Sequence, residues 1–237
     1  SKDLYHRINL SYELKDYKIT DYNKVDTNIL SYEGGNANFF LNNTLVLNRL
    51  DSNIRSTKGY YASIDNKISP ITNSDNGIVR NIIRYQKYMP FYKNVLSINS
   101  KVGNISSLQN ATIKNDDKFS LGGRWLRGFD SLGVGPRNSS SSYVGGNNLV
   151  VTKIDLKRNI LSQSDNPLDL NLFLDVGSVF GNKNTSTYEK ESIRSSYGIG
   201  VNFYSPIGPI SFTWGFPIMS ESYDIKRMFL FTIGGVN

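Results

Sequence analysis

Apolar and polar residues alternate with a period of two along much of the chain. In SYGIGVNFYSP (196–206), the side chains of Tyr197, Ile199, Val201 and Phe203 share one face, while glycine and asparagine occupy the other. Such alternation is the signature of β-strands, and no segment shows a convincing helical period. The pattern predicts about ten strands, at 5–14, 39–50, 59–68, 77–88, 93–103, 150–156, 170–176, 196–206, 210–216 and 229–234.

The predicted strands are longer than those of an ordinary soluble sheet. Six of these segments have 10–12 residues and the other four have 6–7. We expect complete strands of about 9–12 residues, against a usual length of about 5–6, and a strand of that length tilted by about 45° crosses a bilayer. Tight turns are predicted at 51–58, 89–92, 161–167 and 205–209, and longer polar loops at 16–38, 69–76, 104–148, 181–194 and 219–226. Short turns on one rim and long loops on the other are typical of a transmembrane antiparallel β-barrel.

The two faces of the predicted strands differ in chemistry. Aromatic residues near strand ends on the apolar face suit an interfacial girdle; they are Tyr197, Phe203, Trp214, Phe216 and Phe229. The opposite face suits a water-filled lumen and carries Asn171, Asp175, Gly198, Asn202, Ser211 and Thr213. A soluble β-sandwich is the alternative, but it would need a second apolar layer, which these polar faces do not supply.

Composition narrows the possible functions. The chain has no Cys, which excludes disulfides and thiolate metal sites. It has no apolar run of about 18 residues, so we predict no membrane-spanning helix. The net charge of +7 fits either an anionic partner or an AT-biased genome rich in Lys and Asn. Because Lys and Arg are scattered, no nucleic-acid interface is predicted.

The sequence gives little support for an enzyme. His6 is the single histidine, so a metal site built on two histidines is not available. The chain lacks a GxSxG nucleophile elbow, and its glycine pairs do not form a phosphate-binding or dinucleotide motif. We therefore predict no catalytic residues, no metal and no cofactor.

The segment FSLGGRWLRGFDSLGVGPR (119–137) is too rich in glycine for a helix and too interrupted for a strand. It predicts a long ordered loop. At its tip, Arg127 and Phe129 flank Gly128, so a planar cation and an aromatic ring project from a sharp turn. A loop of this composition is suited to docking into another part of the fold.

Two aspartates on neighbouring predicted strands are candidates to receive this loop. Asp155 and Asp175 both have the parity of the polar face. If the loop folds inward, Arg127 could bind one carboxylate bidentately, with Phe129 or Phe173 packed alongside. The simpler alternative is that both carboxylates are solvated and idle. We interpret the group as a latch that fixes the loop, and not as a catalytic dyad.

Several motifs in this order resemble the BamA family of outer-membrane insertases. The loop is similar to the family's long lumenal loop, whose hallmarks are matched by Gly122, Gly123, Arg127, Gly128, Phe129, Gly135, Pro136 and Arg137. NRLDSNIRSTKGYY, LFLDVGSVF, SYGIGVNFYSPIGPISFTWGFPI and RMFLFTIGG resemble a periplasmic turn and later strands of the family. The resemblance therefore covers nearly the whole chain.

The resemblance implies a barrel of about sixteen strands preceded by periplasmic substrate-binding repeats. Residues 1–237 would be its C-terminal portion, with about ten strands and a lumenal loop at about 104–148; the first strands and the repeats would lie outside this sequence. In the family the loop arginine contacts an acid on each of the next two strands. Those positions are Asp155 and Asp175, with Phe173 nearby.

The implied function is non-enzymatic insertion and folding of β-barrel proteins in the bacterial outer membrane, through a lateral seam between the first and last strands. The closing strand would carry Phe229, Phe231 and Ile233, and Gly234 would allow a kink that weakens the seam. The implied partners are unfolded outer-membrane proteins, accessory outer-membrane lipoproteins and the bilayer. Where the family usually ends on an aromatic residue, this chain has Asn237.

Three alternatives remain at this point. A TamA-like autotransporter assembly factor shares the loop motif, and the upstream repeats would separate it from an insertase. A two-partner-secretion-type transport pore would carry a plug helix upstream. A passive porin would lack the Arg-Gly-Phe loop.

Overall fold

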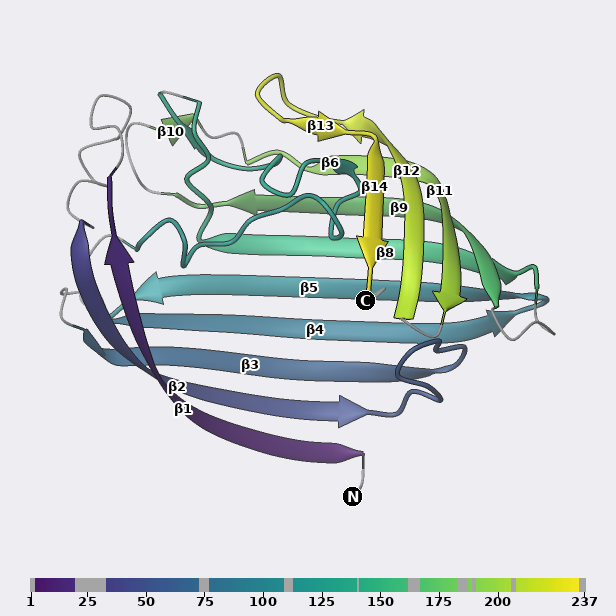
Figure 1. Cartoon of the computed structure of the whole chain (residues 1–237), viewed down its shortest axis with the longest axis horizontal. Helices are drawn as coiled ribbons and strands as arrows, with labels where there is room; N and C mark the ends of the chain where they lie inside the picture. The colour runs from purple at the N-terminus through teal and green to yellow at the C-terminus, as the bar shows by residue number, and fades with distance from the viewer. Residues whose placement is uncertain are drawn as a thin grey trace.

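The protein is described by a computed structural model that covers residues 3–19, 33–72, 77–108, 113–139, 141–161, 167–182, 187–188, 191–205 and 208–234. Within these ranges the chain forms a ten-stranded sheet with the order β1-β2-β3-β4-β5-β8-β9-β11-β12-β14. Each of these strands pairs antiparallel with the next in this order (Figure 1). The prediction of an all-β antiparallel fold is confirmed. In the described part of the chain, no helix is long and apolar enough to cross a membrane.

The long strands are β1 (Leu4–Tyr17), β2 (Gly34–Asn48), β3 (Gly59–Thr72), β4 (Ile78–Phe91), β5 (Asn94–Ser107), β8 (Asn148–Asn159), β9 (Leu168–Phe180), β11 (Arg194–Ser205) and β12 (Gly208–Met219). β14 (Phe229–Ile233) is shorter. Four two-residue strands lie outside the main sheet: β6 (Gly128–Phe129), β7 (Arg137–Asn138), β10 (Thr187–Tyr188) and β13 (Lys226–Arg227). β6 pairs with β13, and β7 pairs with β10.

The predicted ends of the first two strands were wrong. The expected loop at 16–38 is shortened at both ends, because β1 continues to Tyr17 and β2 begins at Gly34, where these two residues pair. The polar residues 15–17 and 34–38 interrupt the apolar alternation, and the prediction therefore stopped early. Residues 206–207 of the predicted turn at 205–209, and Asn237, lie outside the described residues.

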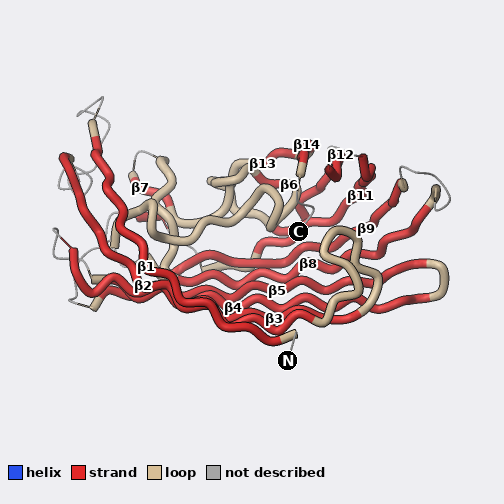
Figure 2. The backbone as a smooth tube through the Cα atoms, turned by 60° about the horizontal axis from the view of Figure 1, so that its bottom comes forward, coloured by secondary structure: helices blue, strands red, loops and turns tan. Residues whose placement is uncertain are grey.

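The sheet curls into a trough, and its two faces are chemically distinct (Figure 2). Large apolar side chains stand exposed on the outer face of successive strands; among them are Leu45, Ile64, Ile83, Val102, Val150, Leu172, Ile199, Trp214 and Phe231. On β9, for example, Leu172 is 53% exposed, whereas its neighbour Asn171 is 3% exposed on the inner face. An apolar outside and a polar inside match the wall of a transmembrane barrel.

The long loop between β5 and β8 lies in the hollow of the trough (Figure 2). Its apolar residues and those of the inner wall form one buried cluster; the cluster contains Phe40, Ile78, Ile105, Ile113, Phe119, Leu121, Leu126, Phe129, Val134, Leu149, Val151 and Val179. The main hydrophobic core is therefore a contact between loop and wall, and no second sheet is required.

A row of asparagines crosses the outer face of five adjacent strands. Each member is the direct cross-strand partner of the next, in the order Asn43, Asn66, Asn81, Asn104 and Asn148. Two amide–amide hydrogen bonds link members of the row: Asn66 donates to Asn81 at 2.6 Å, and Asn104 donates to Asn148 at 2.8 Å. Asn43 also contacts His6 on β1. The apolar outer wall thus carries a row of amide side chains across these five strands.

Candidate functional site

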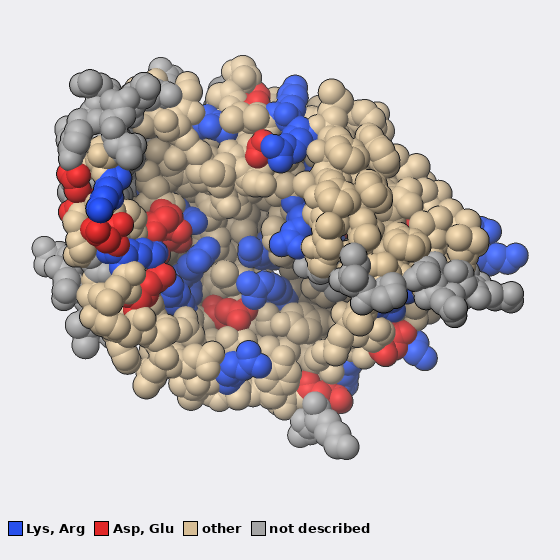
Figure 3. Space-filling model, in the orientation of Figure 1, with Lys and Arg blue, Asp and Glu red and all other residues tan. Residues whose placement is uncertain are grey.

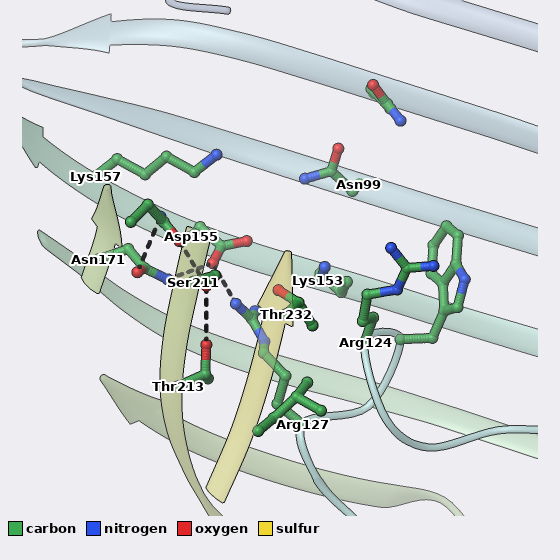
Figure 4. Close-up of a pocket in the computed structure, with 14 residues that line it drawn as sticks. Asn99, Arg124, Arg127, Lys153, Asp155, Lys157, Asn171, Ser211, Thr213 and Thr232 are labelled. Atoms are coloured by element: carbon green, nitrogen blue, oxygen red, sulfur yellow. Dashed lines mark hydrogen bonds and ion pairs between the residues drawn. The ribbon is translucent and has the colours of Figure 1, made fainter. Parts of the chain in front are cut away.

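Arg127 lies between two strands of the inner wall and binds both predicted aspartates. Its Nε and Nη2 donate to the two oxygens of Asp175 at 2.8 and 2.5 Å, and its Nη1 donates to Asp155 at 2.7 Å. Its backbone N–H also donates to Asp175 at 3.0 Å. Asp155 accepts a further bond from Asn171 at 3.1 Å, and Figure 4 shows Arg127, Asp155 and Asn171 at the edge of a cavity.

The surroundings of Arg127 make this a strong contact. The side chains of Arg127, Asp155 and Asp175 are 8%, 5% and 0% exposed. The guanidinium stacks 3.6 Å from the centre of the Phe173 ring. Burial alone would lower the pKa of Arg127, but the charges and hydrogen bonds of the two aspartates outweigh burial and raise the pKa. The cation is therefore held charged inside the hollow.

Gly128 places the loop tip directly against β12. Its φ of +94° is favourable only for glycine, and a side chain there would meet the backbone of Gly215 at 3.1 Å. Conversely, a Cβ on Gly215 would lie 2.6 Å from the Gly128 nitrogen. Phe129, which is 1% exposed, is part of the core between loop and wall. Two glycines therefore allow two backbones to meet.

The other loop-motif residues shape the loop itself. Gly122, Gly123 and Gly135 have φ values of +133°, +55° and +128°, each of which favours glycine. Arg137 donates to the carbonyl of Leu132 at 2.8 Å and stacks on Tyr143, while the carbonyl of Pro136 accepts from Val144. These residues fold the loop, whereas Arg127 attaches it.

The residues predicted for the closing strand are separate from the contact of Arg127 with the two aspartates, but they are connected to it by backbone pairing. Phe229, Phe231 and Ile233 point to the outer face of β14, and Gly234 follows with a φ of +70°. Just before β14, Lys226 and Arg227 of β13 pair with Phe129 and Gly128 of β6. The loop tip is thus hydrogen-bonded to the segment that enters the closing strand.

Sequence reasoning missed two further arginine–aspartate contacts, one partly buried and one fully buried. Arg55, in the turn after β2, binds Asp169 with two bonds of 3.0 and 2.6 Å. Arg194 binds Asp224 at 3.0 Å, and both side chains are fully buried. Asp169 could have been found, because it has the same inward parity on β9 as Asp175. Arg194 and Asp224 lie at a strand end and in a loop, where periodicity gives no signal.

The turn at 51–58 is organised by the carboxylate of Asp51. One oxygen accepts from the backbone N–H groups of Thr57 and Lys58 at 2.9 and 3.2 Å, and the other accepts from the Thr57 hydroxyl at 2.5 Å. The partial burial of Asp51 would raise its pKa, but these hydrogen bonds lower it overall. This explains why an aspartate stands six residues before Thr-Lys-Gly.

A change at Gly215 tests how closely loop and wall must approach. We expect Gly215→Ala to push the Gly128 backbone away and to destabilise the docked loop by about 1–3 kcal/mol, the usual cost of overpacking. Hydrogen exchange of the amides near Gly128 should become faster. Gly35→Ala on β2 is the matched control, because a Cβ there meets no atom within 4 Å. Unchanged exchange in the Gly215 variant would show that the loop does not depend on this contact.

Comparisons with known proteins agree with this architecture. A family model for the Omp85 superfamily domain matches residues 2–236. The chain is 27% identical over 208 residues to the outer membrane protein assembly factor BamA of Neorickettsia risticii, and 24% identical over 220 residues to that of Nitratidesulfovibrio vulgaris. It is 27% identical over 222 residues to the sorting assembly machinery 50 kDa subunit of Saccharomyces cerevisiae.

These alignments cover 85%, 90% and 87% of this chain but 28%, 27% and 44% of the respective relatives. The chain therefore spans about a quarter of the length of the bacterial relatives. The crystal structure of Haemophilus ducreyi BamA lacking POTRA domains 1–3 superposes with a TM-score of 0.81 at 20% identity, and covers 98% of this chain and 51% of that one. The family match extends over almost every residue, and the chain belongs to the Omp85 superfamily.

Proposed function

We propose that this chain is the C-terminal portion of a barrel that folds and inserts β-barrel proteins through a lateral seam between its first and last strands. The chain is part of an outer-membrane β-barrel of the Omp85 superfamily. The assembly-factor names of the bacterial and yeast relatives support an assembly role over a transport pore. The proposed clients are unfolded outer-membrane proteins, and accessory lipoproteins are proposed as further partners.

The observation that carries this proposal is the incomplete pairing of the closing strand. β14 pairs with β12 only from Phe229 to Ile233. Immediately before β14, the carbonyl of Met228 accepts a hydrogen bond from the Gly215 N–H of β12. The two residues that precede Met228 pair with β6 and not with β12. The hydrogen-bonded contact of the closing strand with its neighbour is therefore short.

A closing strand with so short a pairing suits β-augmentation, in which a client strand adds to the sheet through backbone hydrogen bonds. No nucleotide or covalent step is required, because the folding free energy of the client drives the insertion. In this mechanism Arg127 acts as a latch. It holds the loop tip at β6, and the loop in turn holds the segment that leads into β14.

Site-specific cross-linking tests the seam. The chain contains no Cys, so a single Cys at Thr232 on β14 introduces one defined thiol in this region. In the full-length protein we expect it to form a disulfide with a Cys in the terminal strand of a stalled client. A Cys at Val102, on the outer face of β5, is the control and should not react with the client. Equal yields at the two positions would contradict pairing at the seam.

A further inference from the structure

Four adjacent strands present a row of cations to the hollow of the trough. We name it the cation strip, and its members on β3, β4, β5 and β8 are Lys67, Arg80, Arg84, Lys101, Lys153 and Lys157. The same four strands carry only two acids, Asp65 and Asp155. Asp65 is bound by Arg84, and Asp155 is bound by Arg127 from the loop. Figure 3 looks into the hollow and shows Lys and Arg side chains gathered around it, with Asp and Glu side chains among them.

The strip contains like charges placed directly opposite each other. Lys67 is the cross-strand partner of Arg80, and Arg84 is the cross-strand partner of Lys101. Directly opposed like charges destabilise a sheet. Asp117 lies near Lys67 and Arg80, but both charged neighbours of Lys101 are cations, namely Arg84 and Arg80. The sheet thus retains a repulsive arrangement that an added anion would relieve.

Aromatic rings hold five of the six cations in place. Lys67 lies 3.6 Å from the centre of the Phe40 ring, and Arg80 lies 4.5 Å from that of Phe119. Lys101 and Lys153 lie 4.8 and 5.9 Å from the centre of the Trp125 ring. Lys157 lies 5.5 Å from the centre of the Tyr88 ring. A ring attracts a cation without neutralising it. The strip is therefore positioned and still positively charged.

The strip adjoins a cavity that reaches the inner face of the closing strand. The cavity has a volume of about 80 Å³, and its lining includes Arg124, Lys153 and Lys157 together with Thr232 of β14. Figure 4 shows Lys153, Lys157 and Asn99 around this space. Lys153 and Lys157 are four residues apart on β8, a separation of about 13 Å. Carboxylates on one face of an extended peptide repeat about every 6.8 Å, so acids four residues apart match this spacing.

We propose that the cation strip binds an acidic stretch of extended polypeptide inside the hollow. The assignment of that polypeptide to a client rests on the proposed function. Carboxylates of the incoming chain supply Lys101 with an acidic neighbour, which it lacks, and add to the acids that Lys153 and Lys157 share with Arg127 and Arg55. The β8 end of the strip, Lys153 and Lys157, lines the same cavity as Thr232 of β14, so an acidic segment held at that end stays next to the seam at which its neighbouring strand pairs.

Binding of a labelled peptide to the full-length protein in nanodiscs tests the proposal. The probe is a peptide of about ten residues in which Glu alternates with Ser, and its control has Gln in place of Glu. We expect the Lys101→Gln/Lys153→Gln variant to bind the Glu peptide about tenfold more weakly, and the Lys101→Arg/Lys153→Arg variant to retain binding. Lys58→Gln/Lys87→Gln, in a turn and on the outer face, is the matched control and should bind normally.

Three results would overturn the proposal: equal binding of the Glu and Gln peptides, unchanged affinity in the Lys101→Gln/Lys153→Gln variant, or complete competition by inorganic phosphate at equal total charge. The last would indicate a site for a compact oxyanion. A second comparison tests whether the bound polypeptide is a client. If the parent and the Lys101→Gln/Lys153→Gln variant both assemble an acidic client as well as the same client with its acids neutralised, the strip does not act on clients. Failure of the proposed function is distinguishable, because the parent would then bind the Glu peptide and assemble no client.

Discussion

Replacing Arg127 by alanine should release the lumenal loop and strongly reduce client assembly while leaving most strands paired. The change leaves Asp155 and Asp175 as buried charges without their cation, which typically costs about 3–5 kcal/mol. The charges are 5% and 0% exposed, so water cannot compensate easily. Arg127→Lys should also be defective, because an ammonium cannot reproduce bonds from three guanidinium nitrogens to two carboxylates.

Two measurements check this expectation. Hydrogen exchange of the amides of Gly128 and Phe129 should become at least about a hundredfold faster, and assembly of a client by the full-length variant in liposomes should fall. Arg124→Ala, in the same loop but exposed, is the control and should leave exchange at the tip unchanged. Normal client assembly by the Arg127 variant would refute the latch role.

Replacing Arg194 by alanine should loosen the loop before β14. Arg194 donates to Asp224 with Nε at 3.0 Å, to the Tyr223 hydroxyl at 2.9 Å and to the Ser192 carbonyl at 2.7 Å. Both charged side chains are fully buried, so loss of one again costs about 3–5 kcal/mol. Asp224 lies immediately before Ile225, whose backbone pairs with Asp130 and Gly133 of the lumenal loop.

The Arg194 variant should therefore show faster exchange first at Lys226 and Arg227 of β13 and then at Phe129 of β6. The double variant Arg194→Met/Asp224→Leu should recover part of the protection, because it removes both buried charges. Arg158→Ala, on the exposed outer side of β8, is the control. If exchange in β13 stays at the parent level in the Arg194 variant, the ion pair does not position the loop.

Much of the fold could be predicted from the sequence, because apolar and polar residues that alternate with a period of two indicate strands with one apolar and one polar face. Leu172 and Asn171 show how sharply the two faces differ. Strand ends were less predictable where the apolar alternation stops before the pairing does, as at Tyr17 and Gly34. The two-residue strands are too short to show any alternation of apolar and polar residues in the sequence.

The contact of Arg127 with the two aspartates was predictable, because the position of each aspartate in its strand and the loop motif led to the same expectation. Parity placed Asp155 and Asp175 on the inner face, and the loop motif offered Arg127 as their partner; the structure brings these groups into contact. The functional role of this contact as a latch stays a prediction. Pairing between β6 and β13 could not be foreseen, because it depends on backbone groups about a hundred residues apart and on no particular side chain.

The asparagine row on the outer wall has a consequence for the surrounding lipid. Strands of a transmembrane wall are tilted, so a row perpendicular to them runs obliquely through the bilayer. Asn148 stands at a strand end, whereas Asn43 and Asn66 lie in mid-strand, where acyl chains surround the protein. Hydrocarbon cannot satisfy the spare amide donors. We expect water and headgroups to follow this diagonal inward, and the lipid annulus to be dimpled along β2, β3 and β4, several strands away from β14.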